Sequence, residues 1–259
     1  MLIRLKNMPS SNHNSRLPLE AEAERFVADK LKREFRLVVF DCDDTLWAGD
    51  NGKAFLFWEI TQGVLPQDVV DWVVPRYAAY ERGEVDEETM CGEMVSIHAG
   101  LKLTEVEQAA ARFCDEVIAG CVFTEMLELA HRLKATGCEI WAVSSTNEWV
   151  IRAGVKQYGI APEKVLATST INKKGLVTKD LLRVPTGPGK ARAIREMIGR
   201  PVDAVFGNSM HDLAMLELAK NPFVINPNPD LRLIAEARSW PVYWPQSFAR
   251  VADRASMAK

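Results

Sequence analysis

The chain has 259 residues, of which 47% are hydrophobic, with a formal net charge of −3 and a pI near 5.9. This length can bury one full core and a modest additional domain. The weakly acidic charge excludes the basic surface typical of nucleic-acid binding, and no apolar stretch is long enough to cross a bilayer. Five cysteines without metal-type spacing favour reduced thiols, and residues 1–16 are polar rather than signal-like. We therefore expect a cytoplasmic protein that binds neither nucleic acid nor membrane.

An amphipathic helix is predicted ahead of the first strand. Apolar residues recur at helical spacing from Leu19 to Leu31, and Pro18 occupies a position typical of a helix start. We expect residues 1–35 to form a helical extension that packs on the core.

The first predicted strand, Leu37 to Phe40, ends in a cluster of acids. Asp41, Asp43 and Asp44 follow it directly, together with Thr45. A buried strand of this kind delivers its following residues to the carboxyl edge of an α/β sheet, where such folds place their chemistry. Two carboxylates two residues apart can divide the work, with Asp41 attacking an electrophile and Asp43 moving a proton. Their charge calls for a hard cation such as Mg²⁺.

The cluster has two other interpretations. A polar strand end that only solvates a turn is common and accounts for the acids equally well when they are taken alone. A calcium loop beginning at Asp41 requires Gly at its sixth position and Glu at its twelfth, which here are Leu46 and Gly52. The calcium loop is therefore excluded.

The segment from residue 50 to 124 is predicted to be helical. Helices are expected over Phe55 to Ile60, over Val69 to Tyr80 with an interruption at Pro75, and over Glu87 to His98. A capping box at Thr104 to Glu107 is expected to start a fourth helix. Residues 50–124 are thus predicted to form a small helical cap that can close over the acids and exclude water.

Strands and helices alternate after the cap. Predicted strands at 139–143, 164–167, 202–206 and 222–226 alternate with helices near 148–158, 190–198 and 211–218, with a hairpin tip at Gly175. This order is typical of a doubly wound parallel sheet. The fold class is therefore α/β, with residues 36–49 and 125–245 forming the core, the cap inserted between them, and 246–259 a C-terminal tail.

Three further polar groups follow these elements. Ser144 and Ser145 end the second strand, Lys190 opens a helix after Gly187 and Gly189, and Asn208 and Asp212 follow the strand at 202–206. Each also has a structural interpretation: Ser144 as a helix cap and Lys190 as an exposed helix-start lysine. For His211, the histidine nearest to these groups, a helix-start or surface role is favoured.

This ordered set resembles the haloacid dehalogenase superfamily, specifically its phosphatase branch with a DxDx[TS] first motif, over roughly residues 36 to 245. The resemblance implies that Asp41 is the nucleophile that forms an aspartyl phosphate and that Asp43 is the general acid and base. It implies that Ser144 and Lys190 contact the phosphoryl oxygens, Ser145 being a further substrate-binding candidate. The metal candidates are Asp41, Asp43, Asn208 and Asp212.

The position of the cap resembles the phosphoserine-phosphatase-like subgroup. Within that resemblance Asp50 is a candidate for reading a substrate amino group, and Arg76 and Arg82 are candidates for binding a carboxylate. Aromatic residues near Asp50 could hold a quaternary ammonium group. Packing of the cap onto the core is the favoured interpretation for these aromatics, which are Trp47, Phe55, Phe57 and Trp58.

One residue departs from the family pattern. Asn208 occupies the place of a metal-binding aspartate, and its amide oxygen can coordinate Mg²⁺ without adding charge. The expected function is Mg²⁺-dependent hydrolysis of a small phosphorylated metabolite through an aspartyl phosphate. The alternatives are transfer of the phosphoryl group to an alcohol, or binding of a phosphate ester without turnover.

Overall fold

The computed structural model describes residues 19–247. A seven-stranded sheet lies at its centre, with strands in the order β4-β3-β2-β1-β5-β6-β7. The strands are β1 Leu37–Phe40, β2 Glu139–Asn147, β3 Val165–Lys173, β4 Leu176–Arg183, β5 Val202–Gly207, β6 Ala219–Ile225 and β7 Val242–Tyr243. The α-helices are α1 Ala21–Leu31, α2 Asn51–Gln62, α3 Gln67–Glu81, α4 Glu87–Ser96, α5 Leu103–Glu116, α6 Thr124–Ala135, α7 Glu148–Val155, α8 Pro188–Met197, α9 Leu213–Leu216 and α10 Pro229–Ala237.

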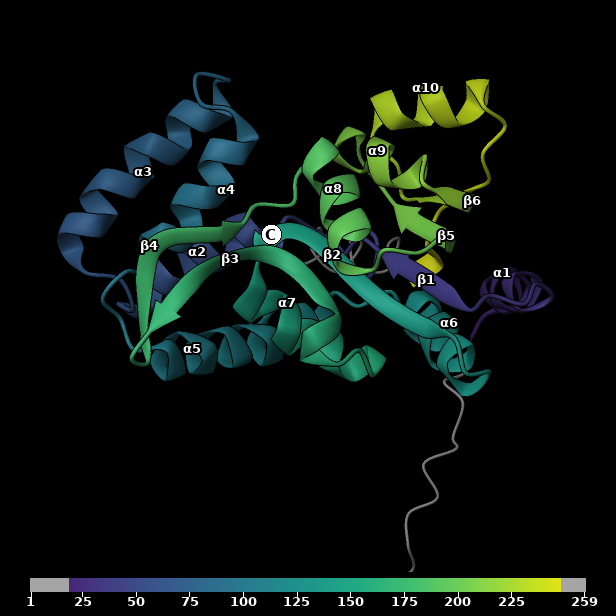
Figure 1. Ribbon diagram of the computed structural model, residues 1–259, viewed down its shortest axis with the longest axis horizontal. Helices are drawn as coiled ribbons and strands as arrows, with labels where there is room; N and C mark the ends of the chain where they lie inside the picture. Colours follow the sequence, from purple (N-terminus) through teal and green to yellow (C-terminus); the bar gives the residue numbers. More distant parts are fainter. Residues whose placement is uncertain (1–18, 248–259) are drawn as a thin grey trace, which may run out of the picture.

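All neighbouring strands pair in parallel except β3 and β4, which form an antiparallel hairpin at one edge. The hairpin turns at Gly175, where φ is +78°, a conformation that glycine adopts without a steric penalty. Both the predicted α/β fold class and the predicted hairpin are confirmed. β1 lies between β2 and β5, so the carboxyl ends of these three strands meet at one edge of the sheet (Figure 1).

Helices cover both faces of the sheet. Residues of β1 alternate between the two faces, because successive side chains of a strand point to opposite sides. Val38 and Phe40 join a large apolar core with α1, α5, α6 and α7, whereas Leu37 and Val39 join a second core with α8, α9 and α10. Figure 1 shows α8, α9 and α10 on one side of the strands and α5, α6 and α7 on the other. β1 is consequently buried along its whole length.

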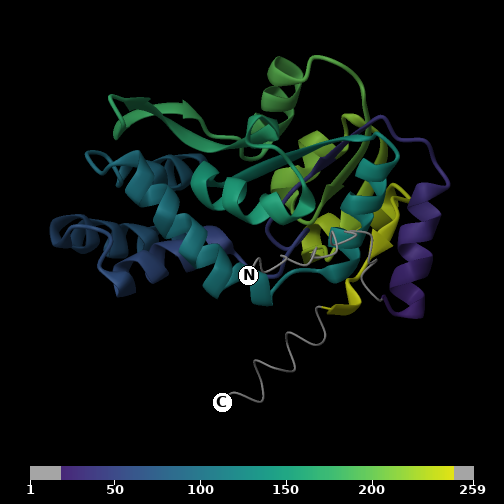
Figure 2. The same cartoon turned by 90° about the horizontal axis from the view of Figure 1, so that it is seen from below.

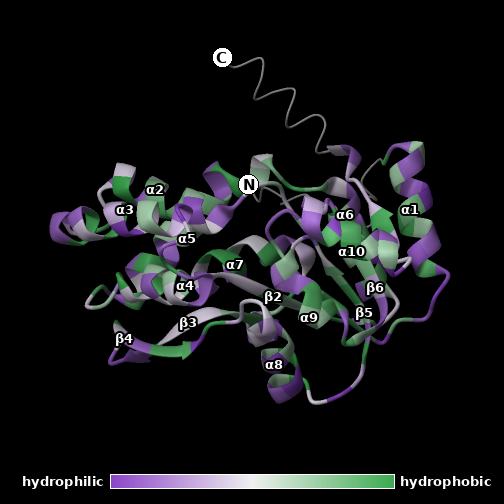
Figure 3. Cartoon of the chain, turned by 90° about the horizontal axis from the view of Figure 1, so that it is seen from above, coloured by the Kyte–Doolittle hydropathy of each residue, from purple (hydrophilic) through white to green (hydrophobic). Residues whose placement is uncertain are grey.

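The N-terminal helix α1 packs on the core. α1 lies against α6, and its Val27 is fully buried in the large core. Figure 3 shows the alternation of hydrophilic and hydrophobic residues along α1. Arg132 of α6 fixes the contact by donating to both carboxylate oxygens of Glu24, at 2.6 and 2.8 Å. Pro18, the predicted start signal, lies outside the described residues.

α2, α3 and α4 project beyond the sheet and share a small apolar cluster that includes Leu56, Val73 and Met90. Figure 2 shows these helices grouped at one end of the molecule. The predicted interruption at Pro75 is wrong, because α3 runs through it. Pro75 has no amide N–H, so the carbonyl of Asp71, four residues earlier, loses its helical hydrogen bond. Asp71 and Pro75 both lie on the exposed side of α3, where water can bond that carbonyl instead.

α5 packs on α7 and belongs to the large core. Its predicted capping box is wrong, since the helix begins at Leu103 with Lys102 as the N-cap. The reason is a tertiary contact: the amide of Leu103 donates to the carbonyl of Gly175 in the hairpin, at 2.9 Å, and so needs no side-chain cap. Among the described residues, no helix is both long and apolar enough to cross a membrane.

Candidate active site

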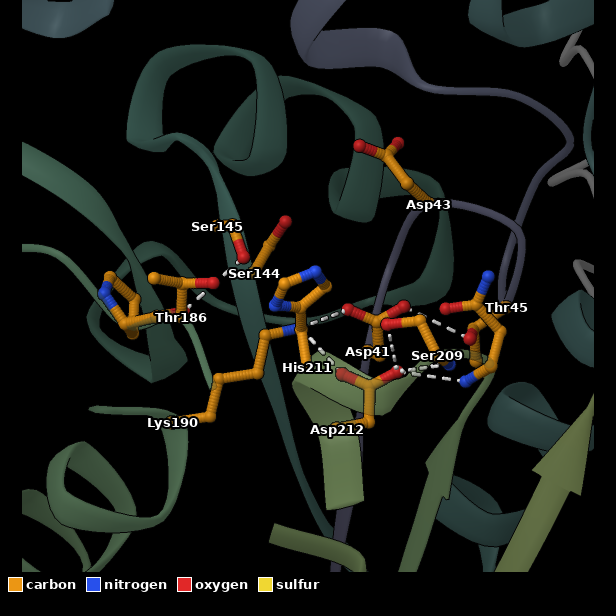
Figure 4. Close-up of polar contacts among 12 residues, drawn as sticks. Asp41, Asp43, Thr45, Ser144, Ser145, Thr186, Lys190, Ser209, His211 and Asp212 are labelled. Carbon is orange, nitrogen blue, oxygen red and sulfur yellow. Dashed lines mark hydrogen bonds and ion pairs between the residues drawn. The ribbon is translucent and has the colours of Figure 1, made fainter. Parts of the chain in front are cut away.

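Asp41 lies directly after β1 and is 4% exposed. Its amide donates to the carbonyl of Phe206 in β5, which extends the pairing of the strands by one residue (2.9 Å). One carboxylate oxygen accepts from Lys190 Nζ at 2.6 Å, and the other accepts from the Thr45 hydroxyl at 3.0 Å. Figure 4 shows these groups converging on Asp41. Thr45 belongs to the sequence motif, and its role as a donor to Asp41 emerges only from the structure.

Lys190 lies in the first turn of α8, which begins after Gly187, where φ is +49°. It is only 3% exposed, so its interpretation as an exposed helix-start lysine is wrong. Its ammonium group lies 2.6 Å from Asp41 and 2.6 Å from Asp212. The alternation of strand and helix therefore brings a buried cation to the end of β1.

Asp212 supports Lys190 from behind. One oxygen accepts from Lys190, and the other accepts from the amides of Asn208 and Ser209, at 2.8 and 3.0 Å. Gly207 makes this turn possible, because a Cβ at that position would lie 2.8 Å from Cβ of Asp212. Asp212 is fully buried, and its described contacts position the lysine and the turn after β5. A role for Asp212 as a metal ligand stays a prediction.

Burial and neighbouring charge shift the pKa values of this group. Burial, reinforced by the charge of Asp212, raises the pKa of Asp41 from 3.8 to about 7 even though Lys190 opposes the shift. Burial alone would lower the pKa of Lys190, but the two carboxylates outweigh it and raise that pKa well above its usual value. The lysine is therefore permanently charged, whereas Asp41 is a carboxylate that a further cation would readily stabilise.

Asp43 is held by three donors. One oxygen accepts from Trp47 Nε1 at 2.7 Å and Asn51 Nδ2 at 3.0 Å, and the other accepts from the Thr146 hydroxyl at 2.7 Å. Burial, together with the charge of Asp50, raises its pKa from 3.8 to about 6. Figure 4 shows the Asp43 carboxylate directed away from Asp41. Its pKa allows it both to hold and to release a proton near neutrality.

The end of β2 supplies hydroxyl groups. Ser144 is 2% exposed and accepts from the amide of Thr146 at 3.2 Å, which leaves its own hydroxyl proton available to another acceptor. Ser145 donates to the carbonyl of Pro185 at 3.5 Å. The cap of α7 is Asn147, which accepts from the amide of Val150, so the interpretation of Ser144 as a helix cap is wrong.

These groups line one cavity of about 260 Å³. Asp212, although predicted to form part of the site, does not line it. The predicted residues that line it are Asp41, Asp43, Asp50, Ser144, Ser145, Lys190 and Asn208. No three His, Cys, Asp or Glu side chains within residues 19–247 surround a common metal position. Asn208 is an amide, so any metal here would draw on a mixed set of carboxylate and amide oxygens.

Some expectations around Asp50 are corrected. Arg76 is bonded through two nitrogens to Glu93, at 2.8 and 2.9 Å, and Arg82 is bonded in the same way to Glu84. Neither arginine lines the cavity, so neither is placed to bind a substrate carboxylate there. The aromatics near Asp50 do not line it either. Packing is confirmed for Trp47 and Phe55, which are buried in the large core, and Trp58 packs against that core. Phe57 is 39% exposed and does not follow the packing interpretation.

Sequence reasoning missed the residues that α3 and α4 contribute. Glu87, at the start of α4, accepts from the hydroxyl of Thr186 at 2.6 Å and forms an ion pair with His211. Burial opposes the effect, but these partners lower the pKa of Glu87, and the bond to Glu87 raises the pKa of His211. Tyr77, Tyr80, Met90, Cys91 and Met94 also line the cavity. Nothing in the local pattern of these helices distinguishes a cavity-lining residue from a core residue.

The model of the haloacid dehalogenase-like hydrolases matches residues 38–217 of the chain. A probable phosphatase of Mycobacterium tuberculosis is 28% identical over 82% of this chain and 75% of its own length. A histidinol-phosphatase of Neisseria meningitidis is 23% identical over 80% of this chain and 97% of its own length.

Solved structures share the fold. A Bordetella pertussis protein of unknown function superposes with a TM-score of 0.70 and 23% identity, covering 81% of this chain and 98% of its own. A substrate-bound phosphoserine phosphatase superposes with a TM-score of 0.50 and 19% identity, covering 78% of this chain and 90% of its own.

Proposed function

Because this chain belongs to the haloacid dehalogenase-like hydrolases and is a phosphoric monoester hydrolase of a phosphoserine-phosphatase-like kind, we propose that it hydrolyses a small-molecule phosphate ester through an aspartyl phosphate on Asp41. The observation that carries the proposal is that Asp41, Lys190 and Ser144 line one cavity, with Lys190 donating to Asp41. Phosphoryl transfer requires positioning and charge stabilisation more than covalent chemistry, and these three groups supply both.

In the first step an oxygen of Asp41 attacks phosphorus and the bond from phosphorus to the ester oxygen breaks. Lys190 and the Ser144 hydroxyl neutralise charge on the phosphoryl oxygens. Asp43 gives its proton to the departing ester oxygen, which leaves as an alcohol. To reach that oxygen, the Asp43 carboxylate turns from Trp47, Asn51 and Thr146 toward the cavity.

In the second step water attacks phosphorus of the aspartyl phosphate. Asp43, now ionised, takes a proton from the water, and the bond from phosphorus to Asp41 breaks to release inorganic phosphate. The raised pKa of Asp43, about 6, suits a group that serves as acid and then as base.

Magnesium is part of the proposal, and the donor set fits it. Asp41, Asp43 and Asn208 line the cavity and carry oxygen atoms, which are the ligands that Mg²⁺ prefers. Carboxylates outnumber cations around the cavity, with Asp41, Asp43, Asp44, Asp50 and Glu87 against Lys53, Lys190 and His211. A bound Mg²⁺ would offset the repulsion between these acids and an anionic phosphate. Asp212, which accepts from Lys190 and from the amide of Asn208, is proposed as a further metal ligand.

The proposal is tested by measuring phosphate release from p-nitrophenyl phosphate, with Mg²⁺ and with EDTA. We expect release that requires Mg²⁺, is abolished in Asp41→Asn, and falls by about 100-fold or more in Asp43→Asn. Unchanged release in Asp41→Asn would overturn the nucleophile. Nitrophenol released without an equal amount of phosphate, in the presence of an added alcohol, would show a phosphotransferase instead of a hydrolase.

A further inference from the structure

Buried polar atoms without partners are concentrated in α7 and β3. Four buried side-chain polar atoms among residues 19–247 have no hydrogen-bond partner, and all four belong to these two elements: Trp149 Nε1, Arg152 Nε, Ser169 Oγ and Thr170 Oγ1. Buried polar groups are normally bonded, so each such atom calls for a partner. None of these four residues lines the active cavity. A ligand of the active site therefore does not account for them.

Ser169 and Arg183 lie on the face of the hairpin that α7 covers. Ala167, two residues before Ser169 and so on the same face of β3, belongs to the large core together with Val150 of α7. Figure 1 shows α7 against the hairpin, and α7 contacts β3 directly. Arg183 of β4 is the direct partner of Ser169, and opposite residues of antiparallel strands project to the same face. Thr170 projects to the other face.

Arg183 has no ion pair within residues 19–247. Its Nε donates to the carbonyl of Ala167 at 3.4 Å, and its two terminal nitrogens have no partner in that part of the chain. Burial lowers the pKa of Arg183, an effect that the charge of Glu148 opposes and the charge of Arg152 reinforces. Both residues of α7 therefore lie within electrostatic range of Arg183.

Arg152 supplies a second cation beside Arg183. Its Nη2 pairs with Glu148 at 2.9 Å, whereas its Nε is the buried atom without a partner. Glu148 balances one of the two arginines and leaves one positive charge. The charge of Glu107 on α5 also acts on Glu148, but Glu107 is exposed and does not act measurably on Arg183. The cluster therefore has a surplus of donors and of positive charge.

This combination matches an oxyanion. Guanidinium groups bind phosphate and carboxylate oxygens through charge-assisted hydrogen bonds, and a serine hydroxyl can add one more donor. An amine or a metal ion would be repelled by the two arginines. We propose that Arg152, Arg183 and Ser169 form a second site, separate from the active cavity, that binds an oxyanion of the phosphate class. This site does not depend on the proposed hydrolysis.

Titration of inorganic phosphate into the full chain in EDTA tests the second site through the arginine Nε–H signals in proton–nitrogen correlation NMR. The signals are assigned by their loss in Arg152→Met and Arg183→Met. We expect both signals to shift together and to saturate with one dissociation constant. Sodium chloride, titrated over the same range of ionic strength, should give no saturating shift. Shifts that chloride reproduces would show an adventitious ion only and would overturn the proposal.

Substitutions on the two strands locate the bound phosphate. Ser169→Ala and Arg183→Met should each raise the dissociation constant read from the Arg152 signal by about fivefold to tenfold, because each removes a hydrogen bond to the anion. Thr170→Val removes the buried hydroxyl on the other face of β3, and Lys179→Met removes an exposed cation of β4. Both are matched controls and should leave the constant unchanged. Unchanged constants in Ser169→Ala and Arg183→Met would overturn the site.

Ser144→Ala distinguishes the second site from the active cavity, which Ser144 lines. We expect the dissociation constant read from the two arginine signals to stay the same in this variant. A rise as large as that in Ser169→Ala would place the bound phosphate in the active cavity and refute the second site. Thermal unfolding of each variant without phosphate checks that the fold is retained, and Ser169→Ala alone decides the test if Arg183→Met does not fold.

Free phosphate and the phosphate group of an ester share this chemistry. Methyl phosphate, titrated in the same way in EDTA, distinguishes the two sources. Tighter binding of methyl phosphate would assign the site to a phosphorylated ligand, and tighter binding of inorganic phosphate would assign it to the free ion. A titration in which neither compound gives a saturating shift would overturn the proposal.

Discussion

Lys190 and Asp212 form an ion pair of 2.6 Å in which the aspartate is fully buried and the lysine is 3% exposed. The same ammonium group lies 2.6 Å from Asp41, so one cation holds two carboxylates. Lys190→Met is expected to abolish activity and to lower the free energy of unfolding by about 3 kcal/mol at pH 8, because two buried carboxylates lose their partner. Urea unfolding monitored by tryptophan fluorescence measures this.

The loss of unfolding free energy in Lys190→Met should be smaller at pH 5, because protonation there neutralises the unpaired carboxylates. Lys53→Met, which removes an exposed lysine from the cap, is the control and should leave the stability unchanged. A variant at position 190 that unfolds at the same urea concentration as the native chain would contradict this account.

Asp41→Asn should change how stability depends on pH. The pKa of Asp41 is about 7 in the folded chain and near 3.8 in the unfolded one. Between these values the folded state binds a proton that the unfolded state has released, so the contribution of this group to stability decreases as pH rises from about 4 to about 7. In EDTA, Asp41→Asn is expected to be about 1–3 kcal/mol more stable than the native chain at pH 8, and nearly equal to it at pH 4.

This prediction is checked by thermal or urea unfolding across that pH range. The asparagine retains an acceptor for Lys190 and a partner for Thr45, so the comparison isolates the charge. If the free energy of unfolding changed with pH by the same slope in both proteins, burial would not raise the pKa of Asp41 as its surroundings indicate.

Asn208→Asp should tighten Mg²⁺ binding. An aspartate at this position would add a charged oxygen ligand to the cavity that Asp41 lines, and ligand charge is a main determinant of affinity for hard cations. We expect the Mg²⁺ concentration for half-maximal phosphate release to fall about tenfold. Asn172→Asp, on the exposed hairpin strand β3, makes the same charge change far from the cavity and should have no effect. A rise in the required Mg²⁺ concentration would show that Asn208 is not a ligand.

Asp203→Ala should weaken the start of β1. Asp203 accepts from the amides of Arg36 and Leu37, at 2.9 and 3.2 Å, and from Lys220 Nζ at 2.8 Å. Removing it leaves two amides without their acceptor, which should cost about 1 kcal/mol.

The hydrogen bond from Lys220 lowers the pKa of Asp203, so its contribution to stability is present above the unfolded pKa near 3.8 and is lost as pH falls through the folded value. The stability difference between Asp203→Ala and the native chain should therefore narrow as pH falls below about 4. Lys220→Ala leaves the amides bonded and should cost less. A larger loss of unfolding free energy in Lys220→Ala than in Asp203→Ala would contradict this ranking.

The catalytic edge of the sheet could be predicted from sequence because its signals are local. Asp41, Ser144 and Asn208 each follow an apolar β-branched run, and parallel strands place such positions side by side. The hairpin at Gly175 was predictable for the same reason, since a glycine between two polar strand segments is a local turn signal.

Features that depend on tertiary contacts could not be predicted. The predicted capping box at Thr104 does not form, because the amide of Leu103 bonds to the hairpin and the helix begins there. No local sequence pattern reveals this bond. Glu87 lines the cavity only because α4 reaches Thr186 and His211, which are far from it in the chain. The role of Asp212 behind Lys190 likewise arises from the fold, because both of its oxygens are used before any ligand binds.

Asp41 should become phosphorylated during turnover. Rapid acid quenching of the reaction with p-nitrophenyl phosphate, followed by peptide mass mapping, measures this directly. We expect the mass of one phosphoryl group on the peptide that contains Asp41 in the native chain, and none in Asp41→Asn. Phosphate release without a phosphorylated peptide, or phosphorylation at another residue, would contradict the account.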